Sequence, residues 1–150
     1  MTLLATEPRV ASDDVTAATP APEHVERIRQ ALAAVLPDGA LVTASASLER
    51  YSHDEAEWAP YEPALAVARP RTPEQVQAIV RVCLEHQVPL VPRGAGTGLS
   101  GGANATADAV VVSFEAMDAI LAVDPLERYA VVQPGVINDR LRAVVAEQGL

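Results

Sequence analysis

The chain has 150 residues, of which 49% are hydrophobic and only 3% aromatic, so it is long enough to bury one aliphatic core. Its net charge of −9 argues against nucleic-acid binding, which needs a basic surface. The absence of lysine excludes a P-loop lysine and a Schiff base, and the single cysteine excludes an internal disulfide.

Three parts follow one another along the chain. Residues 1–21 are rich in Ala, Thr, Pro, Ser and Asp without periodicity, which predicts a flexible tail. Residues 22–58 form an N-terminal helical segment, in which apolar side chains recur at helical spacing from Pro22 until a Pro-Asp-Gly turn. Residues 59–150 hold most of the predicted strands. No segment resembles a signal peptide or a membrane span, so we expect a cytoplasmic protein.

Strands and helices are predicted in a mixed order over the third part. Short apolar or β-branched runs predict strands at 65–68, 88–92 and 109–113, and a hairpin of 120–124 with 129–133. Helices are predicted at 74–85, started by a Thr72 cap and a capping box with Gln75, and at 137–148, ended by Gly149. This order indicates an α+β fold, with a mixed β-sheet flanked by helices.

Five glycines lie between Gly94 and Gly102, directly after a predicted strand. Glycine costs backbone entropy, so this density indicates positive φ angles or close approach of the backbone to a ligand. Successive N–H groups in such a loop form a concave nest that suits phosphate oxygens, and Arg93 either orders the loop or faces the negative charge. We therefore predict a site for the pyrophosphate of a dinucleotide; the competing interpretation is a flexible surface loop.

The pattern G-x-G-x-x-G occurs at 96–101 but in an unsuitable context. A Rossmann fingerprint needs a helix starting at its end, whereas residues 103–108 lead into a β-branched strand. A Rossmann protein for NAD(P) is therefore disfavoured.

Other polar residues are given ordinary roles. Asp54, Glu55 and Glu57 are expected to form a solvated acidic loop, and the three histidines are too scattered to predict a metal site.

The strand, the segment Pro-Arg-Gly-Ala-Gly-Thr-Gly-Leu-Ser-Gly-Gly at 92–102, the next strand and Val-Gln-Pro-Gly-Val at 132–136 together resemble the FAD-linked oxidase family. This is the fold of vanillyl-alcohol oxidase and p-cresol methylhydroxylase, and the nearest resemblance is to the FAD-binding subunit of glycolate oxidase and to D-lactate dehydrogenases. The segments 51–54 and 69–76 agree with it, so the resemblance covers roughly residues 45–150.

The resemblance implies a cofactor and a set of residues that bind it. By position, FAD would be held by Pro92, Arg93, Gly94, Ala95, Gly96, Thr97, Gly98, Leu99, Ser100, Gly101, Gly102, Gly135 and Val136. Some relatives attach the flavin through a histidine of the glycine loop. Here Thr97 and Leu99 stand in that region, which implies non-covalent FAD.

The resemblance also implies a function for the longer protein. It would be a flavin-dependent oxidoreductase that transfers hydride from a 2-hydroxy acid such as glycolate or D-lactate to flavin N5. Residues 59–150 would then be the first part of a truncated FAD-binding domain, without catalytic residues, and a partner chain could supply the rest. The alternative is a truncated, non-catalytic nucleotide-binding or interaction module.

Overall fold

A computed structural model describes residues 20–150 of the chain, so almost all of the predicted flexible tail lies outside the described part. The helices are α1 (Pro22–Val35), α2 (Ser45–Tyr51), α3 (Pro73–Glu85) and α4 (Asn138–Ala146). The strands are β1 (Leu41–Val42), β2 (Ala66–Ala68), β3 (Leu90–Arg93), β4 (Val110–Ser113), β5 (Ile120–Asp124) and β6 (Tyr129–Val132). The predicted mixed arrangement of helices and strands is confirmed.

A four-stranded sheet in the order β1-β2-β4-β3 forms the centre of the fold. The strand β4 pairs in parallel with both β2 and β3, and β1 pairs antiparallel with β2. The two-residue strand β1 was not predicted, because two apolar residues carry no periodic signal. In the register, Val110 lies beside both Ala66 and Leu90, so the parallel strands end together at one edge.

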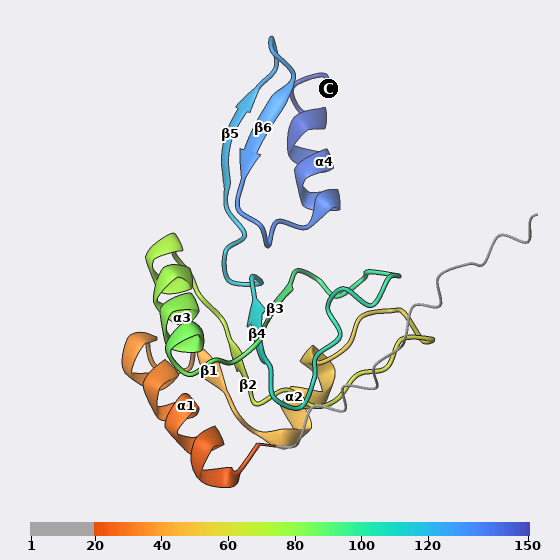
Figure 1. Cartoon of the computed structure of the whole chain (residues 1–150). Helices are drawn as coiled ribbons and strands as arrows, with labels where there is room; N and C mark the ends of the chain where they lie inside the picture. Colours follow the sequence, from red (N-terminus) through yellow and green to blue (C-terminus); the bar gives the residue numbers. More distant parts are fainter. Residues whose placement is uncertain (1–19) are drawn as a thin grey trace, which may run out of the picture.

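Helices cover both faces of this sheet (Figure 1). On one face α1 and α3 bury Ile28, Leu32 and Ile79 against the alternate residues of β2 and β4. On the other face α2 contributes Leu48 and Tyr51, which join the remaining residues of the same strands. Burial on both faces explains why β4 is a continuous run of valines rather than an alternating strand.

The predicted start of α3 is confirmed, with one difference of detail. The Thr72 hydroxyl accepts a hydrogen bond from the backbone N–H of Gln75, as in a capping box. The Gln75 side chain reaches back to the N–H of Arg71 at 2.7 Å, one residue before the expected partner.

The single cysteine, Cys83, lies in the last turn of α3. Desolvation raises the pKa of its buried thiol to about 11, which is consistent with a packing role.

The hairpin β5–β6 and α4 extend beyond the four-stranded sheet (Figure 1). Gly149 has a φ of 78°, and Leu150 N–H donates to Val145 O, so the predicted glycine cap of α4 is confirmed as a Schellman-type end. Neither strand of the hairpin nor α4 holds a fully buried residue. Within the described residues, no helix is long and apolar enough to cross a membrane.

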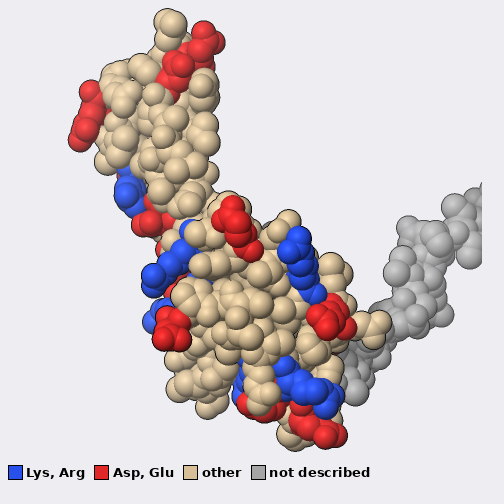
Figure 2. Space-filling model, turned by 90° about the vertical axis from the view of Figure 1, so that its left-hand side faces the viewer, with Lys and Arg blue, Asp and Glu red and all other residues tan. Residues whose placement is uncertain are grey.

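Charge is distributed unevenly over the surface. Figure 2 shows acidic and basic side chains interleaved over the part that contains the sheet, with uncharged area between them. Four arginines, at positions 50, 69, 71 and 93, lie close to the edge where the parallel strands end.

The core between α1 and α3 should dominate stability. Replacing Ile79, which is 0% exposed, by Ala should lower the free energy of unfolding by about 2–5 kcal/mol, because a cavity replaces a filled site. Leu84→Ala in the same helix is the matched control: this side chain is 72% exposed, so the change should stay within about 0.5 kcal/mol. Urea unfolding followed by circular dichroism measures both values, and equal losses would contradict this assignment of the core.

Candidate functional site

The glycine segment leaves the sheet at the carboxyl end of β3. The N–H of Phe114, the residue after β4, donates to Arg93 O at 2.9 Å, so the two parallel strands separate only at this point. Ligands of open α/β sheets bind in the crevice beyond the carboxyl ends of parallel strands. The predicted site therefore lies at the edge of the sheet where binding is expected.

The glycines of the segment serve different physical needs. Gly96 and Gly101 have φ angles of 79° and 73°, which other residues rarely adopt. At Gly98 a built Cβ would lie 3.0 Å from Oδ2 of Asp54, so a side chain there would press on that carboxylate. At Gly94 and Gly102 a Cβ would meet no atom within 4 Å, so these two leave open surface.

The backbone amides of the segment have no acceptors in the described part of the chain. From Gly94 to Gly102, no N–H group donates a hydrogen bond to any of residues 20–150. Two carbonyl groups are used instead: Gly98 O accepts from Glu55 N, and Gly101 O accepts from Asn104 N. The segment is thus fixed through its acceptors while its donors stay free for an anion, which fits a diphosphate group.

Two short motifs anchor the segment. Ser52 is buried; its hydroxyl donates to Leu48 O at 2.7 Å and accepts from Ala64 N, while its carbonyl accepts from Ala105 N. Asn104 bridges in the other direction: its Oδ1 accepts from Asp54 N at 2.9 Å. The end of the glycine segment is thereby tied to the loop after α2.

Asp54 corrects one expectation. The acidic loop was predicted to be solvated, and Glu55 and Glu57 are indeed exposed, but Asp54 is only 7% exposed. Its Oδ1 accepts from Ala56 N at 2.9 Å and its Oδ2 from Ala103 N at 3.5 Å. An aspartate that accepts from the backbone N–H two residues later forms a local turn, which a sequence can indicate. The contact of Asp54 with Ala103, 49 positions away, could not be predicted from the sequence.

The histidines also differ from expectation. His24 and His86 come together, with ring centroids 6.4 Å apart, although they lie on different helices. The ring of His53 packs against Tyr61 at 4.8 Å. Among the described residues no group of three or more metal-ligating side chains forms, so these contacts make no metal site there.

Arg93 lies beneath the glycine segment. A Cβ built on Gly96 would overlap its guanidinium group, which is therefore in contact with the Gly96 backbone. One nitrogen, Nη2, donates to Arg50 O at 3.2 Å, and the group lies 5.8 Å from the centre of the Tyr51 ring. These contacts place the guanidinium against the loop from the protein side, which is compatible with both roles considered from the sequence.

A groove of about 420 Å³ opens between the glycine segment and the start of α4. Its walls are formed by Ala95, Thr97, Pro134, Gly135, Val136, Ile137, Asn138 and Asp139. The turn is held close to the sheet because Gly135 N–H donates to Met117 O at 2.8 Å, and a Cβ on Gly135 would overlap Phe114 O. The first turn of α4 adds a helix N-terminus, whose partial positive charge favours anions.

The predicted binding residues are thus only partly brought together. Ala95, Thr97, Gly135 and Val136 line one groove although up to 41 positions separate them in sequence. Leu99 is 72% exposed and lies outside the residues that line the groove. The residues of the first turn of α4 were not among the predicted binding residues, although the helix itself was predicted to start at residue 137.

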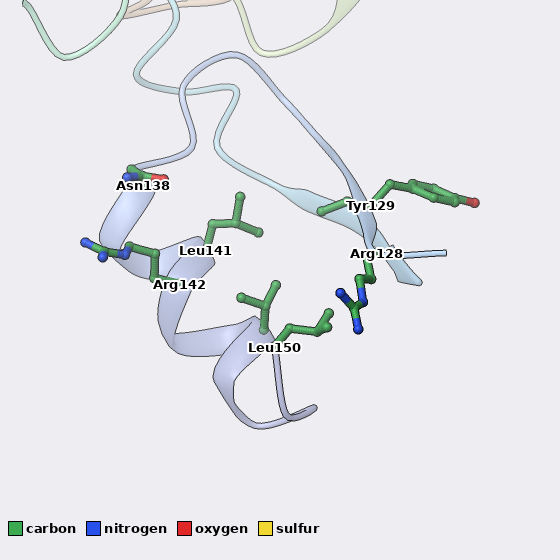
Figure 3. A pocket seen from close by; sticks show the side chains of 8 residues that line it. Arg128, Tyr129, Asn138, Leu141, Arg142 and Leu150 are labelled. Atoms are coloured by element: carbon green, nitrogen blue, oxygen red, sulfur yellow. The ribbon is translucent and has the colours of Figure 1, made fainter. Parts of the chain in front are cut away.

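A second hollow, of about 300 Å³, lies between β6 and α4 and is mainly apolar (Figure 3). Leu141 and Leu150 point toward the hairpin, and Arg142 points away from it. Leu141 and Val145 line the hollow, so α4 turns an apolar face to the hairpin, and that face is only partly covered. This hollow lacks the free amides of the glycine segment and is not the candidate site.

Removal of the Asp54 carboxylate should loosen the segment. Asp54→Ala leaves the buried Ala56 N–H without an acceptor, so unfolding should become easier by about 1–3 kcal/mol. Amide exchange at Ala56 and Ala103, whose N–H groups donate to this carboxylate, should accelerate as well. The control is Glu57→Ala, an exposed carboxylate of the same loop, and a similar effect of both changes would show that Asp54 has no special role.

The sequence of the chain is similar to those of known proteins. The FAD binding domain family matches residues 64–150, which include the glycine segment and the turn before α4. A D-2-hydroxyglutarate dehydrogenase of Stutzerimonas stutzeri is 40% identical over 119 residues, covering 79% of this chain and 25% of that protein. The glycolate oxidase subunit GlcD of Bacillus subtilis is 46% identical over 80 residues, covering 53% of this chain and 17% of that protein.

The fold agrees with these sequence similarities. The crystal structure of p-cresol methylhydroxylase with substrate bound superposes with a TM-score of 0.74 at 26% identity, over 87% of this chain and 26% of that one. The chain thus spans between 17% and 26% of the length of these three proteins. The sheet edge, the glycine segment and the match over more than half of the residues lead to one conclusion: this chain belongs to the FAD binding domain family.

Proposed function

We propose that this chain is the FAD-binding part of a flavin-dependent oxidoreductase that acts on a 2-hydroxy acid. The observation that carries the proposal is the row of backbone N–H groups from Gly94 to Gly102, which have no acceptor among residues 20–150 and lie at the carboxyl edge of the sheet. The family match supports FAD as the dinucleotide.

The amides of the glycine segment would hold the diphosphate group. Hydrogen bonds from N–H groups to an anion are stronger than those between neutral groups, and they are already oriented here by the bonds at Gly98 O and Gly101 O. Across the groove, the first turn of α4 would face the same charge. Thr97, which lines the groove, adds a hydroxyl donor.

The cofactor would be held without a covalent bond. No histidine occurs between Pro92 and Gly102, so the segment has no counterpart of the histidine through which some relatives attach the flavin. When bound, FAD supplies the electron-accepting chemistry, and the residues of this chain bind and orient it.

The substrate class rests on relatives. Both sequence relatives described above are named for the oxidation of a 2-hydroxy acid, glycolate or D-2-hydroxyglutarate, which supports this class over the phenols of p-cresol methylhydroxylase. The matched segments cover only 25% and 17% of these two proteins. We therefore propose that substrate is bound by sequence outside these 150 residues, in a longer protein or a partner chain.

Gly96 should be essential for binding FAD. In Gly96→Val the side chain would have to displace the Arg93 guanidinium and adopt a φ of 79°, so flavin affinity should fall by about tenfold or more. Titration of FAD, followed by flavin fluorescence, gives the affinity.

Gly39→Val is the matched control for this experiment. Its φ of 74° imposes similar backbone strain, but Gly39 lies in the turn before β1, away from the groove. The control should lose stability and keep the wild-type affinity for FAD. Binding by Gly96→Val as tight as in the control would refute the assignment of the glycine segment.

Turnover should require more than this chain. Loaded with FAD, the 150 residues should oxidise glycolate and D-lactate no faster than free FAD, whereas a longer protein that contains them should bleach its flavin under anaerobic conditions with one of these acids. Acid precipitation of the loaded protein should leave the flavin in the supernatant. Turnover by the chain alone, or flavin retained in the pellet, would contradict the proposal.

A further inference from the structure

Arg93 is a cation without a counter-charge in the described part of the chain. Its guanidinium forms no salt bridge with any of residues 20–150, and its single hydrogen bond goes to a backbone carbonyl. The nitrogen Nη1 is fully buried and has no hydrogen-bond partner. A buried polar atom without a partner is rare in folded proteins and requires a physical explanation.

The carboxylate that Tyr51 links to Arg93 is already engaged elsewhere. The Glu115 carboxylate accepts from the Tyr51 hydroxyl at 2.9 and 3.0 Å and pairs with Arg69 at 3.3 Å. Tyr51 therefore stands between Arg93 and Glu115, with its ring toward the guanidinium and its hydroxyl toward the carboxylate. The positive charge of Arg93 is not neutralised by this network.

A second unpartnered group lies beside Arg93. Ser113 is its register partner on β4, so the two side chains leave the sheet on the same face, and the Ser113 hydroxyl is also buried without a hydrogen bond. The uncompensated cation and this hydroxyl both lie at the strand ends, and the cation contacts the Gly96 backbone.

We propose that Arg93 is the fixed counter-charge of the diphosphate site: it acts through the Gly96 backbone, from the protein side, and does not touch the ligand. This inference rests on the proposed function, since it assigns the source of positive charge for the anion that the amides bind. Partial burial of a cation costs free energy in the ligand-free protein. An anion on the opposite side of the same backbone offsets that cost. The free amides supply the geometry of binding, and Arg93 supplies the charge.

This role differs from that of a structural support in a measurable way. If Arg93 only held the loop in shape, its removal would lower the stability of the ligand-free protein. If Arg93 is instead an uncompensated charge, its removal leaves the stability of the ligand-free protein unchanged or raises it. The removal then lowers only the stabilisation gained from a diphosphate ligand.

The test compares Arg93→Gln and Arg93→Lys with the wild-type chain. Arg81→Gln is the control, because this exposed arginine of α3 makes the same change in net charge. Thermal unfolding midpoints are recorded without ligand and with FAD, ADP or riboflavin, and dissociation constants are measured for each. ADP carries the diphosphate without flavin, and riboflavin carries flavin without phosphate.

The proposal expects Arg93→Gln to weaken binding of FAD and ADP by about tenfold or more, with no fall in the ligand-free midpoint and no change for riboflavin. Arg93→Lys should recover part of the affinity, and Arg81→Gln should match the wild type. Unchanged FAD and ADP affinity in Arg93→Gln overturns the proposal. So does a lower ligand-free midpoint that Arg93→Lys does not restore.

Two further outcomes separate this inference from the proposed function. If the wild-type chain binds neither FAD nor ADP, the proposed function fails, whatever the variants do. If Arg93→Gln does not fold, Arg93→Lys decides: FAD affinity near that of the wild type supports the counter-charge, and loss of affinity in a folded Arg93→Lys protein overturns it.

Discussion

The parallel pairing of β4 with two neighbours, under helices on both faces, is the constraint on which the rest of the structure depends. A strand buried on both sides cannot slip, since any change of register would move valines that already fill two cores. The ends of β3 and β4 are consequently fixed relative to each other. That fixed edge is what allows a loop of glycines, with little rigidity of its own, to present its amides in a defined direction.

The loop gains its order from its acceptors and from side chains below it. Bonds to Gly98 O and Gly101 O, with the Asp54 carboxylate and Asn104 amide behind them, hold the backbone, while every N–H from Gly94 to Gly102 is left without an acceptor among residues 20–150. This arrangement favours anion binding, because N–H groups that are already oriented need no rearrangement when the anion arrives. Arg93 completes it by placing positive charge on the covered side of the same backbone.

Sequence reasoning succeeded where the signal was local. The cap at Thr72, the turn glycine after α4, the hairpin and the β-branched run of β4 each follow from a few adjacent residues, and the density of glycines marks the candidate site. It failed where partners are distant. Asp54 looked like a solvated acid, and His24 and His86 looked unrelated, because the contacts that decide their roles join residues about 50 to 60 positions apart. The two-residue strand β1 was too short to show any periodicity.

The two walls of the groove differ in how firmly they are held. The glycine wall is attached to the central sheet through buried side chains, whereas β5, β6 and α4 contain no fully buried residue. The second wall is held by the close approach of Gly135 to residues 114–117 and by an exposed ion pair between Arg140 and Asp118, which contributes about 1 kcal/mol at most. A ligand that spans the groove would therefore order this wall more than the other. On the proposed function, the glycine segment and Arg93 would determine whether a diphosphate binds, and the hairpin and α4 would respond to its binding.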